Sequence, residues 1–259
     1  MFNIITILLY VAGSITQAYP ARSIRHIRNT LLFVFVIPAI ILHGDLLYKW
    51  IDLTQGQNLT VYNLFSLATW LTTSIIIFIA LFRPIGYLAI LILPLAALSI
   101  LLAGNFPSSH IINTAAQPKQ FLHILLSVAT FSVLLIAGLQ AVTLAFQEKL
   151  LKQKNFEISQ TLPPIETMEK QLFQMIIAGS ILLGLVLITS IYFFHTVLLQ
   201  QFLQKTILTF AALCVFVLLL IGRHYFGWRG KKAIYCTLSG FGILSIIYFS
   251  SMIIMELLP

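Results

Sequence analysis

The stretch from Phe121 to Phe146 constrains this chain most, because no Asp, Glu, Lys or Arg interrupts it. A helix needs about 20 apolar residues to cross a bilayer core, so this stretch is long enough to span with some tilt. Its one ionisable side chain is His123, one helical turn in from a polar segment, and Ser127 and Thr130 follow at helical spacing. A membrane helix with a histidine near one end is a candidate for binding a ligand through that side chain.

The composition extends this reasoning to the whole chain. Hydrophobic residues make up 59%, charged residues only 8%, and the mean hydropathy is +1.00. Soluble domains carry about 25% charged residues. The apolar runs are continuous rather than alternating, which excludes a β-barrel and predicts an all-α, polytopic membrane protein. We predict one transmembrane domain over residues 1–259, with about eight spans at residues 2–18, 30–47, 61–81, 85–103, 121–146, 171–194, 206–222 and 233–257.

The basic residues of the loops predict the orientation of these spans. The formal charge of +8 needs no nucleic-acid partner, because basic residues gather in the cytoplasmic loops of membrane proteins. Twelve of the fifteen Lys and Arg residues fall on one side of the predicted spans, and Lys49, Lys119 and Lys205 fall on the other. This asymmetry predicts that both termini lie on the outer, periplasmic side.

The six histidines follow the same topology. His43, His110, His123 and His195 lie at or beyond the outer ends of spans, whereas the other two lie on the cytoplasmic side. One histidine at a membrane interface is ordinarily an amphipathic anchor, but neutral imidazole also ligates iron. Two such histidines on different helices could hold a haem b. The candidate axial pair is His123 with either His43 or His195.

Other chemistry finds little support. The motifs GxSxG and HExxH and the P-loop are absent, and Cys214 and Cys236 form no CxxC pair. Glu166 and Glu169 are interpreted as acidic residues at the start of the sixth span. Arg223 and Arg229 are interpreted as anchors at lipid headgroups.

A haem-free alternative is a non-catalytic membrane accessory subunit or a small-molecule permease. A permease built from inverted repeats would have broken helices at corresponding positions in its two halves. Pro38 and Pro94 interrupt the second and fourth spans, but the last four spans contain no proline. This asymmetry disfavours the permease, while the accessory subunit stays open.

Several stretches together resemble one family. Leu122–Gln140, Leu162–Phe173 and Gly222–Gly230 are similar to the cytochrome c assembly membrane proteins, in the YpjD/HemX-like branch of the CcsA superfamily. His43 on the second predicted span, and Asn63, Ser66 and Trp70 on the third, extend the similarity toward the N-terminus.

The resemblance implies a haem-handling protein of the bacterial inner membrane. It would present haem on the periplasmic face, with apocytochrome c or other cytochrome c maturation proteins as partners beside membrane lipid. His123 matches the family's outer histidine, and His224 lies near a second family position. The Trp-rich outer motif is missing and Gln204 stands where relatives often carry a histidine. These departures favour a haem-delivery assembly factor over a self-sufficient enzyme.

Overall fold

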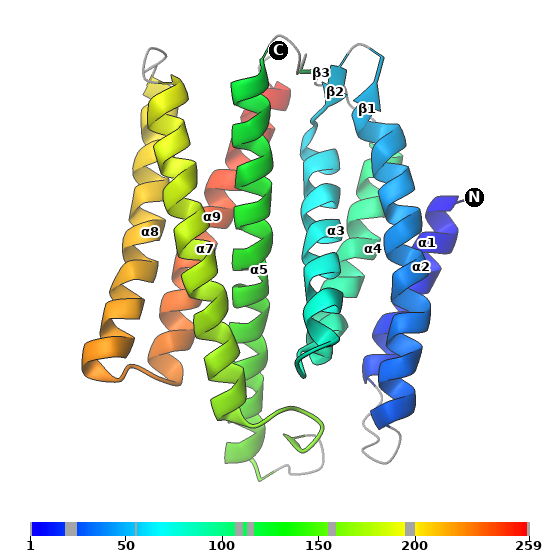
Figure 1. The fold of residues 1–259 in the computed structure, drawn as a ribbon, viewed down its shortest axis with the longest axis vertical. Coiled ribbons are helices and arrows are strands. Elements are labelled where there is room, and N and C mark those ends of the chain that lie inside the picture. The colour runs from blue at the N-terminus through cyan, green and yellow to red at the C-terminus, as the bar shows by residue number, and fades with distance from the viewer. Residues whose placement is uncertain are drawn as a thin grey trace. The chain divides into compact units, whose positions relative to one another are not determined.

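The computed structural model describes residues 2–18, 25–54, 56–106, 111–112, 117–154, 159–194 and 200–257 (Figure 1). Its contacts divide the chain into two compact units, Met1–Ile112 with Lys149–Pro163 and Asn113–Glu148 with Pro164–Pro259.

The first unit is a four-helix bundle with a small sheet at one end (Figure 1). Its elements are α1 (Phe2–Ala18), α2 (Arg25–Ile51), β1 (Asp52–Leu53), β2 (Gly56–Asn58), α3 (Val61–Ala80), η1 (Gly86–Leu88), α4 (Ala89–Asn105) and β3 (Ile111–Ile112). Helix α1 packs on α2 and α4, and α3 packs on the same two helices.

The sheet was not anticipated. Its three strands run antiparallel in the order β1-β2-β3, with Asp52 opposite Gln57 and Gln57 opposite Ile112. The sequence predicted loops here because two- and three-residue strands carry no alternating pattern long enough to detect.

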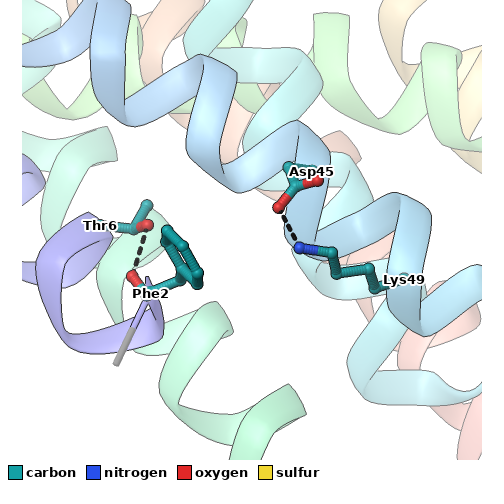
Figure 2. A network of polar contacts seen from close by, with 4 residues as sticks. All are labelled: Phe2, Thr6, Asp45 and Lys49. Atoms are coloured by element: carbon teal, nitrogen blue, oxygen red, sulfur yellow. Dashed lines mark hydrogen bonds and ion pairs between the residues drawn. The ribbon is translucent and has the colours of Figure 1, made fainter.

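The C-terminal end of α2 carries a charged pair beside α1. Asp45 and Lys49 form an ion pair one helical turn apart, and both side chains are about half exposed. The Lys49 ammonium lies 5.3 Å from the centre of the Phe2 ring, and Thr6 donates a hydrogen bond to the carbonyl of Phe2 (Figure 2). The charge of Asp45, which lies near the predicted end of a span, is therefore balanced by its own helix.

The second unit consists of four helices that alternate in direction (Figure 1). They are α5 (Pro118–Lys152), α7 (Ile165–Phe194), α8 (Gln200–Phe226) and α9 (Lys231–Leu257). Helix α8 packs on α7 and α9. On α5, the ring of Phe131 stacks on that of Tyr248 of α9, with ring centres 4.3 Å apart.

The helical membrane fold is confirmed. In the part of the chain that the structure describes, seven helices are long and apolar enough to cross a membrane, and α1 is a shorter apolar helix of 17 residues. The predicted polar segment Gln147–Lys170 is shorter than expected, because α5 continues to Lys152 and α7 begins directly after Pro164. Charged residues continue a helix readily once it has left the bilayer, so hydropathy underestimates helix length. The periplasmic location of the termini stays a prediction.

A close approach of α5 and α7 gives a first testable prediction. A Cβ atom added at Gly179 would lie 2.3 Å from the Leu134 side chain, which is fully buried. We expect Gly179→Ala to lower the free energy of unfolding by about 2 kcal/mol, because the side chain of Leu134 or one of the helices must move. SDS-induced unfolding in mixed micelles measures this change. Gly184→Ala on the same helix is the matched control, since no atom lies within 4 Å of its added methyl, and it should leave stability nearly unchanged.

Candidate functional site

His123 lies half-buried near the start of α5 and contacts α7. Its Nδ1 is 2.9 Å from the hydroxyl oxygen of Thr189, and that hydroxyl lies 2.9 Å from the carbonyl of Val186. A threonine hydroxyl has one proton, and here it is donated to the Val186 carbonyl, so the oxygen accepts from His123. In the neutral ring, the proton is then on Nδ1 and the lone pair is on Nε2. This is the arrangement that metal-ligating histidines adopt, in which the second ring nitrogen is held by a hydrogen bond.

The small polar residues that follow His123 serve their own helix. Ser127 donates to the carbonyl of His123 at 2.8 Å, and Thr130 donates to that of Leu126 at 2.7 Å. Such bonds to the preceding helical turn satisfy hydroxyl groups inside a membrane helix. The helical spacing that drew attention to these residues therefore reflects backbone bonding in α5.

A cation lies one turn from His123. Lys119 is on the same helix, four residues earlier, and its ammonium lies 5.9 Å from the centre of the Phe193 ring on α7. Residues four apart share one face of a helix. The start of α5 thus offers an imidazole and an ammonium on one side.

His43 lies in the interior of the first unit. Its side chain is fully buried, its Nδ1 lies 3.1 Å from the Tyr10 hydroxyl, and its Nε2 lies 2.8 Å from the Ser66 hydroxyl. The Tyr10 ring also meets the imidazole edge-on, with ring centres 5.7 Å apart. Both ring nitrogens are thus engaged, and His43 could ligate iron only by releasing one of these hydrogen bonds.

The polar residues that sequence analysis noted on α3 share one face with Ser66. Asn63 donates from Nδ2 to the carbonyls of Asn58 and Trp50, and Trp70 donates from Nε1 to the carbonyl of Ile40. The acceptors Trp50 and Ile40 lie on α2, and Asn58 ends β2. The face formed by Asn63, Ser66 and Trp70 therefore holds α3 to α2. Tyr10 was missed by sequence reasoning, because nothing in an apolar span indicates that its tyrosine will meet a histidine.

His224 lies at the opposite end of the second unit from His123. Ser190 is the neighbour of Thr189, which contacts His123. The Ser190 hydroxyl oxygen lies 3.5 Å from that of Thr206, near the start of α8. His224 lies roughly 18 residues further along α8, which is about 27 Å at 1.5 Å per residue. It is exposed and meets Tyr225 edge-on, with ring centres 4.9 Å apart. His123 and His224 cannot share one iron.

The remaining histidines add little geometry. His110 and His195 lie outside the described residues, and the side chain of His26 is not described. Across the described ranges, no group of three or more His, Cys, Asp and Glu residues gathers as a metal site. Of the predicted ligands that the structure describes, only His123 and His224 share a unit, and they lie at its opposite ends, while His43 belongs to the first unit.

A second polar cluster, which the sequence did not predict, holds the turn between α8 and α9. Glu169 of α7 accepts a hydrogen bond from the backbone N–H of Gly230 at 2.7 Å and lies 3.7 Å from Arg223. Gly227 and Gly230 have φ angles of +62° and +55°, which favour glycine. The Arg223 guanidinium also lies 4.5 Å from the centre of the Phe173 ring.

Two interpretations are corrected by this cluster. Glu169 is buried and binds the turn, whereas only Glu166 lies exposed in the first turn of α7. Arg223 is only partly exposed and is paired with Glu169, so it is a structural residue, while Arg229 is exposed as a headgroup anchor requires.

These structural features lie almost entirely within a region shared with known proteins. The family model described as "Cytochrome C assembly protein" matches residues 31–258. The chain belongs to the cytochrome c assembly protein family. The family match contains all four candidate ligand histidines and the Glu169 cluster, whereas Tyr10 lies before it.

Relatives agree with this membership. The inner membrane protein YpjD of Escherichia coli K12 is 31% identical over 208 residues, which cover 80% of this chain and 79% of the relative. An uncharacterized 28.8 kDa protein of Azospirillum brasilense is 29% identical over 130 residues, covering 49% of this chain and 48% of that protein. No solved structure matches the chain significantly. This member of the cytochrome c assembly family is therefore a multi-pass membrane protein with a role in cytochrome c biogenesis.

Proposed function

We propose that this protein binds haem b in the bacterial inner membrane and assists cytochrome c assembly by delivering haem to the periplasmic face. The observation that carries the proposal is the hydrogen bond from His123 to Thr189, which leaves Nε2 as the nitrogen with the lone pair. An imidazole held in this way matches the donor that haem iron takes in an axial position.

The residues around His123 suit the rest of a haem. Lys119 supplies a positive charge on the same face, which would pair with a propionate carboxylate. The apolar residues of α5 and α7 would cover the macrocycle and exclude water. When bound, haem would supply an iron centre, and the ligation and redox state of that iron would prepare the haem for attachment to an apocytochrome.

Elimination among the candidate histidines supports one of them as the second haem ligand. His43 already engages both ring nitrogens, and His224 lies at the far end of the second unit. His195 follows Thr189 by only six residues, a length of chain that spans at most about 21 Å. We therefore propose His195 as the second ligand, with haem bound near the end of α5 that carries His123.

A difference spectrum tests this proposal. The protein is purified after expression with added haem, and the reduced-minus-oxidised spectrum is recorded for the wild type and for single variants. We expect a b-type α-band that His123→Ala and His195→Ala remove and that His224→Ala, the exposed control, retains. Thr189→Val leaves the His123 imidazole in place but removes the hydroxyl that accepts its hydrogen bond. It should weaken haem affinity about 10-fold to 100-fold.

Two results would overturn the proposal. One is a wild-type protein without the band under these conditions. The other is an equal loss of the band in His123→Ala and His224→Ala, which would indicate loosely associated haem. Levels of c-type cytochromes in cells carrying His123→Ala, measured by haem staining, then test whether bound haem is used in assembly.

A further inference from the structure

A cleft opens in the first unit where α1 ends, α2 begins and α3 turns into η1. Its cavity volume is about 50 Å³, well below the roughly 300–1,000 Å³ of drug-sized ligand sites, so the cleft has room for one small group rather than a whole ligand. Thr161 and Pro163, from the segment that precedes α7, complete its lining. All of these residues belong to the first unit, and all lie on the face that loop charge predicts to be cytoplasmic.

The polar side of the cleft is cationic. Arg28 and Arg83 both line it, and none of the described residues of the lining is Asp or Glu. Arg28 is only 8% exposed, although a guanidinium is seldom buried without a specific role. Arg83 is exposed at the tight turn, where the chain reverses between α3 and η1.

The positions of the two arginines are set by the backbone. The buried amide of Gln17 donates from Nε2 to the Arg28 carbonyl at 3.1 Å, which ties the end of α1 to the first turns of α2. The Arg83 N–H donates to the Ile79 carbonyl at 2.9 Å, so the turn continues directly from α3. The backbones of both arginines are therefore held in place, and both residues line one cleft.

The remaining lining is apolar and lies toward the helices. Leu32 is fully buried, Phe33 is half-buried, and Ala80 and Pro84 lie on the α3 side. The cleft is therefore cationic on one side, at the ends of the helices. On the other side it is lined by apolar residues of the helices themselves. A phospholipid has the matching arrangement, with a charged phosphate next to glycerol and apolar acyl chains.

We infer that this cleft is a binding site for a phosphate group, supplied by the headgroup of an anionic phospholipid. Basic pockets between membrane helices on the cytoplasmic side recognise such headgroups. Guanidinium groups bind phosphate through paired, charge-assisted hydrogen bonds. Arg28 and Arg83 line the same cleft, which the positive-inside rule by itself does not require.

Native mass spectrometry of the purified full-length protein tests the inference. The probes are short-chain phosphatidylglycerol, short-chain phosphatidylcholine and inorganic phosphate, each titrated separately. We expect phosphatidylglycerol to bind more tightly than phosphatidylcholine, and Arg83→Gln to weaken it about tenfold through loss of one charged pair. Arg229→Gln, which removes an equally exposed arginine from the turn before α9, should leave binding unchanged.

Arg83 is the primary variant because it is exposed. Arg28→Gln, at the buried arginine, is the second variant and should also weaken phosphatidylglycerol binding. Equal binding of the two lipids, or equal weakening by Arg83→Gln and Arg229→Gln, would overturn the inference. If inorganic phosphate displaces phosphatidylglycerol at equal concentration, the lipid source is overturned and the ligand is a soluble phosphate.

Discussion

His43→Ala is expected to lower the free energy of unfolding by about 3 kcal/mol. The change removes two hydrogen bonds in the interior of the first unit and leaves the buried hydroxyls of Tyr10 and Ser66 without their partner. It also leaves a cavity where the imidazole was. The cavity contributes most of the loss, since hydrogen bonds between membrane helices average about 0.6 kcal/mol and reach about 1.7 kcal/mol. Unfolding by SDS in mixed micelles measures the effect.

The matched control is Tyr10→Phe, which keeps the ring and removes only the hydroxyl. It should cost about 1 kcal/mol. In a double-mutant cycle, the two changes together should cost less than their sum, because they remove the same hydrogen bond. Additive losses would contradict the Tyr10–His43 interaction.

A b-type α-band that disappears in His43→Ala but not in His195→Ala would contradict the proposed haem ligands.

Glu169→Ala is expected to destabilise the second unit by about 2–3 kcal/mol. It removes the acceptor for the Gly230 N–H and the carboxylate that faces Arg223, and Glu169 is only 6% exposed. A hydrogen bond to a charged group is worth about 1.5–3 kcal/mol, and the partly exposed Arg223 recovers some hydration when its partner is lost. Thermal denaturation followed by size-exclusion chromatography in detergent measures the loss.

Two variants separate the role of charge from that of hydrogen bonding at this position. Glu169→Gln keeps an oxygen that accepts from Gly230 and should cost about 1 kcal/mol. Glu166→Ala, three residues earlier and exposed, should change stability by about 0.5 kcal/mol or less. A larger loss in Glu166→Ala than in Glu169→Ala would show that the acidic residues act mainly on the first turn of α7.

Much of the fold followed from hydropathy. The long uncharged runs predicted the helices of both units, because a bilayer forces every spanning segment to satisfy its own backbone hydrogen bonds. The short gap between the predicted spans 61–81 and 85–103 is present as the turn at Arg83 and Pro84. The small sheet and the helical extensions were not predicted, since they lie outside the apolar runs and depend on local pairing.

The candidate site was predictable in part. The sequence pointed to His123 as an isolated ionisable residue in a span, and the family resemblance supported that choice. It treated His43 and His195 as equivalent partners. Only the contacts of His43 with Tyr10 and Ser66 separate the two, and no local pattern encodes those contacts.

The sequence by itself determined the class of this protein, its spans and its short list of histidines. Hydropathy is a sum over neighbouring residues, so one chain segment is enough to evaluate it. The tertiary structure decided what the polar residues do. Thr189 holds His123, Tyr10 holds His43, and Glu169 holds the turn at Gly230. In each pair the two residues come from different segments of the chain. Whether they meet depends on how the helices rotate and pack, which residue spacing alone does not determine.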